Sequence, residues 1–206
     1  MRIGVDFDNT IVAYDHLFLS IAKEWNLVPQ NFSGAKKNIR DRIRARKDGE
    51  MQWQRLQGFI YGKEMDKAKL FPGVADFFQA CKRRGISVDI VSHKTEYAHY
   101  DADNTNLRQA SWAWMEKNAF FTQEGFAIKR DKVMFHNTRD AKLSRIKQMH
   151  YDLFIDDLVE IFTDPGFPDD VKGILFDSEK SAAQSGRYEI YCHWNEISHA
   201  LFGKPG

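Results

Sequence analysis

Cysteine and long apolar runs are both scarce in this 206-residue sequence. The two cysteines, Cys81 and Cys192, have neither paired nor metal-ligand spacing, so no disulfide framework or cysteine zinc site is indicated, although a single disulfide stays open. No run approaches the roughly 20 apolar residues of a membrane-spanning helix, and the first apolar run is broken by Asp6 and Asp8. These absences predict reduced thiols, no membrane segment, no N-terminal targeting signal and a cytoplasmic location.

Net charge is also small, at +1, which gives the molecule as a whole no strong attraction to nucleic acid or to anionic membranes. Internal repeats and low-complexity tracts are lacking as well. The hydrophobic content of 43% and the charged content of 29% are ordinary for a globular protein. The length is sufficient for one sizeable core, or for a core with a small appendage.

Two carboxylates, Asp6 and Asp8, stand two residues apart at the end of the first apolar run. Side chains two residues apart share a face of a strand, so both acids are expected to emerge together at its carboxyl end. Such close acids repel each other unless a cation or a shared proton relieves them. The arrangement suits a metal-assisted reaction in which one carboxylate is the nucleophile and the other the acid/base. The alternative is an aspartate-rich turn with a capping role.

Strand-like and helix-like segments alternate along the rest of the chain. The apolar spacing predicts helices over 14–26, 52–61, 107–118, 141–149 and 195–202, a helix between Gly73 and Gly85, and strands over 86–91, 153–155, 174–176 and 189–191, with a short strand or hairpin within 127–135. Alternation of this kind favours an α/β fold with a parallel sheet that is covered by helices on both faces.

Polar side chains follow three of the predicted strands. They are Asp6 with Asp8, Ser92, and Asp156 with Asp157. In open parallel sheets, sites form beyond the carboxyl ends of the strands, close to where the strand order reverses. Three polar strand ends in one chain therefore predict a single convergent site.

Taken together, these motifs resemble those of the haloacid dehalogenase superfamily of phosphohydrolases. Residues 6–10 resemble the first motif, 88–92 the second, Lys142 the lysine of the third, and 154–157 the fourth motif in its double-aspartate form. The resemblance extends over about residues 1–200 and skips the segment between the first two motifs. It implies a three-layer parallel sheet with a Rossmann-type core, and a small, mainly helical cap inserted after the first motif.

The resemblance also implies catalytic roles. Asp6 would attack phosphorus and become an aspartyl phosphate, while Asp8 would protonate the leaving oxygen and then take a proton from water. Ser92 and Lys142 would bind the transferring phosphoryl oxygens. Positioning and charge neutralisation of this kind supply most of the acceleration in phosphoryl transfer.

A Mg²⁺ cofactor is implied as well, because Mg²⁺ prefers oxygen ligands and the motifs supply several. The protein ligands would be Asp6, the backbone carbonyl of Asp8, and Asp156. Asp157 would act through a water molecule or as a supporting partner of these ligands.

The predicted domains are a catalytic core over 1–13 and 71–206 and a helical cap over 14–70. Eleven Lys/Arg against five Asp/Glu make residues 34–70 basic. Arg40 and Arg44 share a helix face there, which is either a solvated face or a surface that recognises a second anionic group of the substrate. After the second motif, His93 or Lys94 could also contact substrate. A zinc site at His93 is not indicated, because no His-x-x-x-His pattern accompanies it.

The sequence therefore predicts a Mg²⁺-dependent phosphatase acting on a small phosphorylated metabolite, either a nucleotide or a sugar phosphate. The dehalogenases of the superfamily act on carbon and usually lack the second aspartate, so Asp8 favours a phosphate ester. Phosphomutases share the motif set and stay open. Two further alternatives are a polynucleotide end phosphatase, in which the basic cap binds nucleic acid, and a non-catalytic binding or regulatory protein that retains the fold.

Overall fold

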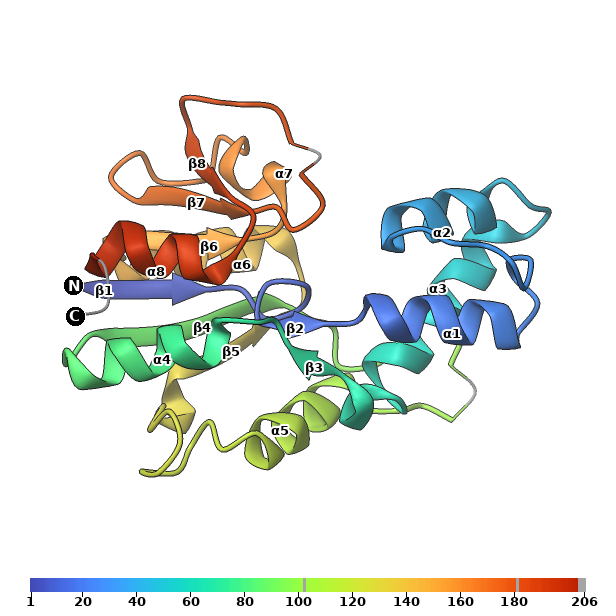
Figure 1. The fold of residues 1–206 in the computed structure, drawn as a ribbon, viewed down its shortest axis with the longest axis horizontal. Coiled ribbons are helices and arrows are strands. Elements are labelled where there is room, and N and C mark those ends of the chain that lie inside the picture. The colour runs from blue at the N-terminus through green and yellow to red at the C-terminus, as the bar shows by residue number, and fades with distance from the viewer. Residues whose placement is uncertain (102, 181, 204–206) are drawn as a thin grey trace. The chain divides into compact units, whose positions relative to one another are not determined.

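The computed structural model describes residues 1–101, 103–180 and 182–203, and the chain forms two compact units. Unit 1 consists of Met1–Val12, Leu70–Lys94 and Asn118–Gly206, and unit 2 consists of Ala13–Lys69 and Thr95–Lys117. Figure 1 labels the elements of both units. The sequence-based boundaries left residues 95–117 in the core, whereas the contacts within the chain group them with the helical unit 2.

Unit 1 is built on a parallel sheet with the strand order β5-β4-β1-β6-β7-β8 among the described residues. The strands are β1 (Arg2–Val5), β4 (Ser87–His93), β5 (Val133–His136), β6 (Leu153–Asp156), β7 (Lys172–Phe176) and β8 (Tyr188–Tyr191). β1 lies between β4 and β6, with Val5 level with Ile90 on one side and Ile155 on the other. The strand order reverses around β1, so the ends of these three strands mark the expected position of a site.

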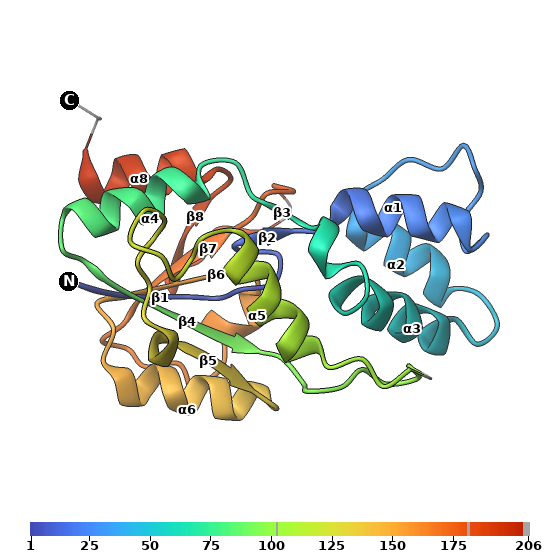
Figure 2. The same ribbon diagram turned by 90° about the horizontal axis from the view of Figure 1, so that it is seen from below.

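Helices cover both faces of this sheet, which confirms the predicted three-layer α/β fold. They are α4 (Val74–Arg83), α6 (Arg139–Met149), α7 (Val159–Phe162) and α8 (Trp194–Phe202), with a 3-10 turn, η2, at Arg130–Lys132. Figure 2 shows α4 and α8 on one face and α6 on the other. Phe77 of α4 packs against Trp194 and Phe202 of α8, with ring centroids 4.8 and 5.6 Å apart, and thereby joins the two helices.

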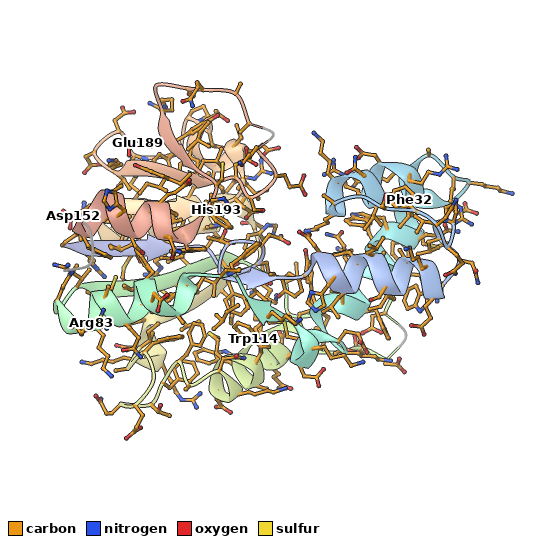
Figure 3. All side chains as sticks on the ribbon, viewed as in Figure 1. Phe32, Arg83, Trp114, Asp152, Glu189 and His193 are labelled. Atoms are coloured by element: carbon orange, nitrogen blue, oxygen red, sulfur yellow. The ribbon has the colours of Figure 1, made fainter. Side chains whose placement is uncertain are left out.

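Unit 2 is helical, with α1 (Asp15–Glu24), α2 (Lys36–Arg44), α3 (Gly49–Tyr61), the 3-10 turn η1 (Met65–Lys67) and α5 (Leu107–Lys117). Its core includes Phe18 stacked on Trp53, with centroids 5.1 Å apart. Ile39 and Ile43 of α2, four residues apart, are fully buried and form the inner face of this helix. The indole nitrogen of Trp114, labelled on α5 in Figure 3, donates to the Ala68 carbonyl at 2.9 Å.

Two very short strands, β2 (Val12–Ala13) and β3 (Lys69–Leu70), form a separate two-stranded sheet. The boundary between unit 1 and unit 2 falls between the two residues of each strand. Two-residue strands carry no period that sequence analysis can recognise, so neither was expected. In the part of the chain that the structure describes, no helix combines the length and apolarity needed to cross a bilayer.

Gly4 is required in β1 because of close ring packing. A Cβ at this position would lie 2.4 Å from Cδ2 of Phe154 and 2.9 Å from Cδ2 of Tyr151, both of which are buried. Rings held on several sides cannot retreat without disturbing their neighbours. The missing side chain therefore lets the face of β1 pack directly against these two aromatic rings.

The substitution Gly4→Ala should destabilise the protein by about 1–3 kcal/mol, the usual cost of overpacking a core. Urea unfolding followed by circular dichroism measures this difference. Gly186→Ala is the matched control, because no atom lies within 4 Å of a Cβ built there, and it should change stability by less than about 0.5 kcal/mol. Equal effects of the two substitutions would contradict the packing argument.

Candidate active site

The carboxyl ends of β1 and β6 bring acidic residues together. The backbone N–H of Asp6 donates to the Ile155 carbonyl at 2.8 Å, so the pairing of β1 with β6 continues one residue beyond Val5. Asp6 and Asp156 are buried, at 5% and 0% exposure. The sheet ladder itself thus holds these two carboxylates at adjacent strand ends.

A tight turn after β1 sets the position of Asp8. The N–H groups of Ile11 and Val12 both donate to the Phe7 carbonyl, at 3.0 and 3.1 Å. Asn9 has a φ of 60°, a left-handed conformation that asparagine tolerates better than most residues. The chain therefore reverses immediately after Asp8 and keeps that residue close to the end of the strand.

Thr10 ties this turn to two other parts of unit 1. Its hydroxyl donates to Asp157 Oδ1 at 3.2 Å, and its carbonyl accepts from the indole nitrogen of Trp194 at 2.9 Å. Thr10 and Trp194 are both fully buried. These hydrogen bonds thus connect the loop after β1 to the loop after β6 and to the start of α8, at the carboxyl ends of the strands.

Three carboxylates form a group that could hold a cation, and we call Asp6, Asp156 and Asp157 the carboxylate cluster. One ligand oxygen from each lies within 4.8 Å of the others. Three carboxylate oxygens are the kind of donor set that Mg²⁺ takes, with waters completing its octahedron. The cluster therefore fits the predicted metal, and the role of Asp157 as a direct ligand or as a supporting partner stays a prediction.

Lys142 lies against this cluster from the first turn of α6. The helix begins at Thr138, whose hydroxyl accepts from the N–H of Ala141 at 3.1 Å. The ammonium of Lys142 donates to Asp6 Oδ1 at 2.5 Å and to Asp156 Oδ2 at 2.6 Å. With its side chain only 1% exposed, Lys142 is a buried cation shared by two buried carboxylates.

Burial and neighbouring charges together set the protonation of Asp6 and Lys142. Burial raises the pKa of Asp6 to about 7, against the opposing charge of Lys142 and with the help of the nearby Asp156 carboxylate. Burial acts to lower the pKa of Lys142, but the carboxylates of Asp156 and Asp6 outweigh it and the pKa is raised. Lys142 thus keeps its proton. Its single positive charge does not balance the two negative charges of Asp6 and Asp156 when both are ionised.

A second buried lysine, Lys94, binds Asp8. Its ammonium donates to both carboxylate oxygens, at 2.8 Å to Oδ1 and 2.6 Å to Oδ2. Lys94 had been considered only as a possible substrate contact, and this ion pair was not foreseen. The available signal was its position two residues beyond Ser92, since that spacing keeps a side chain at the same strand end.

The remaining candidate residues lie as follows. Ser92 is buried near the carboxyl end of β4, the neighbour of β1. The ring Nε2 of His93 lies 3.1 Å from the Asn137 carbonyl oxygen, and burial lowers the pKa of this imidazole. Arg40 and Arg44 lie on α2 in unit 2, where Arg40 pairs with Asp41 and Arg44 makes two contacts with Glu50, at 2.5 and 3.0 Å. The roles of these four residues in substrate binding stay predictions.

No family model matches the sequence, and no curated protein is significantly similar to it. Solved structures match it along nearly its full length. The structure of the HAD-hydrolase YfnB from Bacillus subtilis, bound to magnesium, matches with a TM-score of 0.61 at 12% identity, and 98% of each chain is covered. A HAD hydrolase of family IA, variant 3, from Entamoeba histolytica has a TM-score of 0.58 at 14% identity and covers 98% of this chain and 97% of its own.

A third match carries ligands of interest. The HAD family hydrolase from Deinococcus radiodurans, with bound phosphate and sodium, has a TM-score of 0.54 at 11% identity, covering 97% of this chain and 94% of its own. At such low identity, these matches establish the fold. The sheet order, the inserted helical unit and the full-length matches together show that this chain has the fold of the haloacid dehalogenase-like hydrolases.

Proposed function

We propose that this protein is a Mg²⁺-dependent phosphatase that hydrolyses a small phosphomonoester through an aspartyl phosphate on Asp6. The single observation that carries the proposal is the carboxylate cluster, with its three oxygens within 4.8 Å and Lys142 against it. Such a cluster provides both a cation site and a nucleophile at the end of one strand. The hydrolase fold supports the same reaction class by analogy.

The metal would be held by the carboxylates of Asp6, Asp156 and Asp157 and by the backbone carbonyl of Asp8. Bound there, Mg²⁺ supplies positive charge that offsets the charge of the phosphoryl oxygens. Lys142 contributes a second, permanent positive charge at Asp6 and Asp156. These charges would keep Asp6 ionised and able to act as a nucleophile.

In the first half-reaction, an oxygen of Asp6 forms a bond to phosphorus while the bond from phosphorus to the ester oxygen breaks. Asp8 gives its proton to that ester oxygen, which leaves as an alcohol. In the second half-reaction, Asp8 takes a proton from water as the water oxygen attacks phosphorus, and the Asp6 carboxylate and inorganic phosphate are released. Ser92 and Lys142 would hold the phosphoryl oxygens during both steps.

We favour a small metabolite over a polynucleotide because of how the basic residues of unit 2 are engaged. Arg40 and Arg44 are paired with carboxylates, and Arg46 donates to the carbonyls of Asn26 and Leu27. Arginines that already make contacts within their own unit are less available to neutralise the phosphates of a polynucleotide. A nucleotide and a sugar phosphate both remain compatible with the site, as does phosphoryl transfer by a mutase.

Replacing the nucleophile should abolish turnover. Asp6→Asn is expected to lower kcat for a generic aryl phosphate in the presence of Mg²⁺ by on the order of 10³-fold or more, since the amide cannot form the phosphoenzyme. Colour release from nitrophenyl phosphate measures this rate. Asp169→Asn, a substitution at a side chain that is 87% exposed in the same unit, is the matched control and should keep wild-type activity. Turnover that survives Asp6→Asn would remove Asp6 from the mechanism.

The same substitution should stabilise the metal-free protein at alkaline pH. The pKa of Asp6 is about 7 in the folded state against an ordinary 3.8, so the folded state binds the extra proton and stability falls as pH rises from about 4 to about 7. Asp6→Asn removes this loss, because its amide oxygen still accepts from Lys142 without a charge to bury.

Urea unfolding in EDTA should therefore show the Asp6→Asn variant to be more stable than wild type at pH 8, by on the order of 1–3 kcal/mol. The difference should shrink as the pH is lowered toward 4. If the variant is less stable than wild type at pH 8, the claim that the ionised Asp6 carboxylate destabilises the metal-free protein is wrong.

Mg²⁺ should stabilise the wild-type protein. A ligand that binds only the folded state adds about 2.7 kcal/mol at a concentration of 100 times its Kd. Thermal unfolding of the wild type should shift upward with added Mg²⁺, and the shift should be much smaller in Asp156→Asn, which removes a charged member of the carboxylate cluster. Equal shifts in the two proteins would place the metal elsewhere.

A further inference from the structure

We propose that Lys94 is a positioning residue for Asp8, which holds the carboxylate so that its outer oxygen lone pairs face the leaving group. This inference rests on the proposed phosphatase function and assigns a residue to its proton-transfer step. The ammonium of Lys94 lies 2.8 and 2.6 Å from the two oxygens of Asp8. Contacts with both oxygens hold the carboxylate group of Asp8 beside the ammonium of Lys94.

The lysine is itself fixed from two directions. β4 and β5 pair in parallel up to His93 and His136, and the N–H of Lys94 donates to the His136 carbonyl at 2.8 Å, so the backbone of Lys94 continues the sheet. Its ammonium also lies over the ring of Phe7, 5.5 Å from the centroid. Phe7 is fully buried. Asp8 is thus paired with a cation whose backbone continues the sheet beyond the carboxyl end of β4.

Burial distinguishes this role from direct substrate binding. The Lys94 side chain is 2% exposed and that of Asp8 is 14% exposed, so Asp8 is the more accessible member of the pair. A carboxylate has about four lone-pair positions on its two oxygens. An ammonium that contacts each oxygen once leaves positions on Asp8 for a transferable proton, so the pair need not separate during the reaction.

The two buried lysines of the site therefore have different partners. Lys142 contacts Asp6 and Asp156, the nucleophile and a metal ligand of the proposed mechanism, whereas Lys94 contacts Asp8, the acid/base. Loss of Lys94 should affect the step in which Asp8 gives its proton to the ester oxygen. That step matters most when the leaving oxygen is strongly basic, because such an oxygen cannot leave as an anion.

The test compares two aryl esters that differ in their leaving groups. Lys94→Met should lower kcat for phenyl phosphate by on the order of 10²-fold, the lower range for general-acid catalysis, and for a dinitrophenyl phosphate by only about threefold, because dinitrophenolate needs no proton. KM should change little for either ester. In the Asp8→Asn background, Lys94→Met should cause no further loss for phenyl phosphate, since the two residues act as one unit.

Two further variants guard against a folding effect. Lys82→Met is the matched control: Lys82 of α4 donates to the carbonyls of Gln123 and Gly125, outside the site, so its loss should not alter the ratio of the two rates. Lys94→Gln retains N–H donors without the charge and should give an intermediate ratio. If Lys94→Met alone fails to fold, the double variant with Asp8→Asn, in which no carboxylate is left unpaired, is compared with Asp8→Asn instead.

Three results would overturn the inference. Equal losses on both esters would show a general structural role, and a raised KM with unchanged kcat would show substrate binding by Lys94. An additional loss in the double variant would show that Lys94 acts independently of Asp8. The absence of Asp6-dependent hydrolysis in the wild type would instead refute the proposed function, and this inference with it.

Discussion

Four aspartates and two lysines meet where the central strands of the sheet end, and several of these charges are withdrawn from water. Removing a charge from water costs several kcal/mol per ion even after the protein relaxes, so such a group persists only if its members compensate one another. Lys142 compensates Asp6 and Asp156, and Lys94 compensates Asp8. Burial, with the nearby Asp156 carboxylate, nevertheless raises the pKa of Asp6 to about 7 against the charge of Lys142. The three oxygens of the carboxylate cluster thus offer a set of ligands that could hold a further cation.

The rest of unit 1 can be understood as support for this arrangement. β1 lies at the point where the strand order reverses, so loops from β4 and β6 flank its end. Gly4 lets β1 approach the rings of Phe154 and Tyr151, and Thr10 fastens the loop after β1 to Asp157 and Trp194. These contacts hold the charged side chains in position before any ligand binds, so little conformational freedom remains to be lost on binding.

Unit 2 shows why a count of charges is a weak guide to binding. Residues 34–70 hold eleven Lys/Arg against five Asp/Glu, which suggested a surface for an anionic partner. In the structure, Arg44 makes a double contact with Glu50 and lowers the pKa of that carboxyl group, and Arg46 is committed to backbone carbonyls. Arg44 and Arg46 thus serve internal connections of the helical unit.

Local sequence was sufficient for the α/β fold and for the strand ends at Asp6, Ser92 and Asp156, because both depend on the period of apolar residues over a few positions. Other features depend on which distant segments meet. The pairing of Lys94 with Asp8 joins β4 to the loop after β1, and it exists because those strands are neighbours in the sheet. The meeting of Asp6 with Asp156 and Asp157, and the grouping of residues 95–117 with the helical unit, likewise depend on contacts between distant segments. A linear pattern specifies which side chains point the same way along one element, whereas contacts between elements, and the charge balance that follows from them, are set only when the whole chain packs.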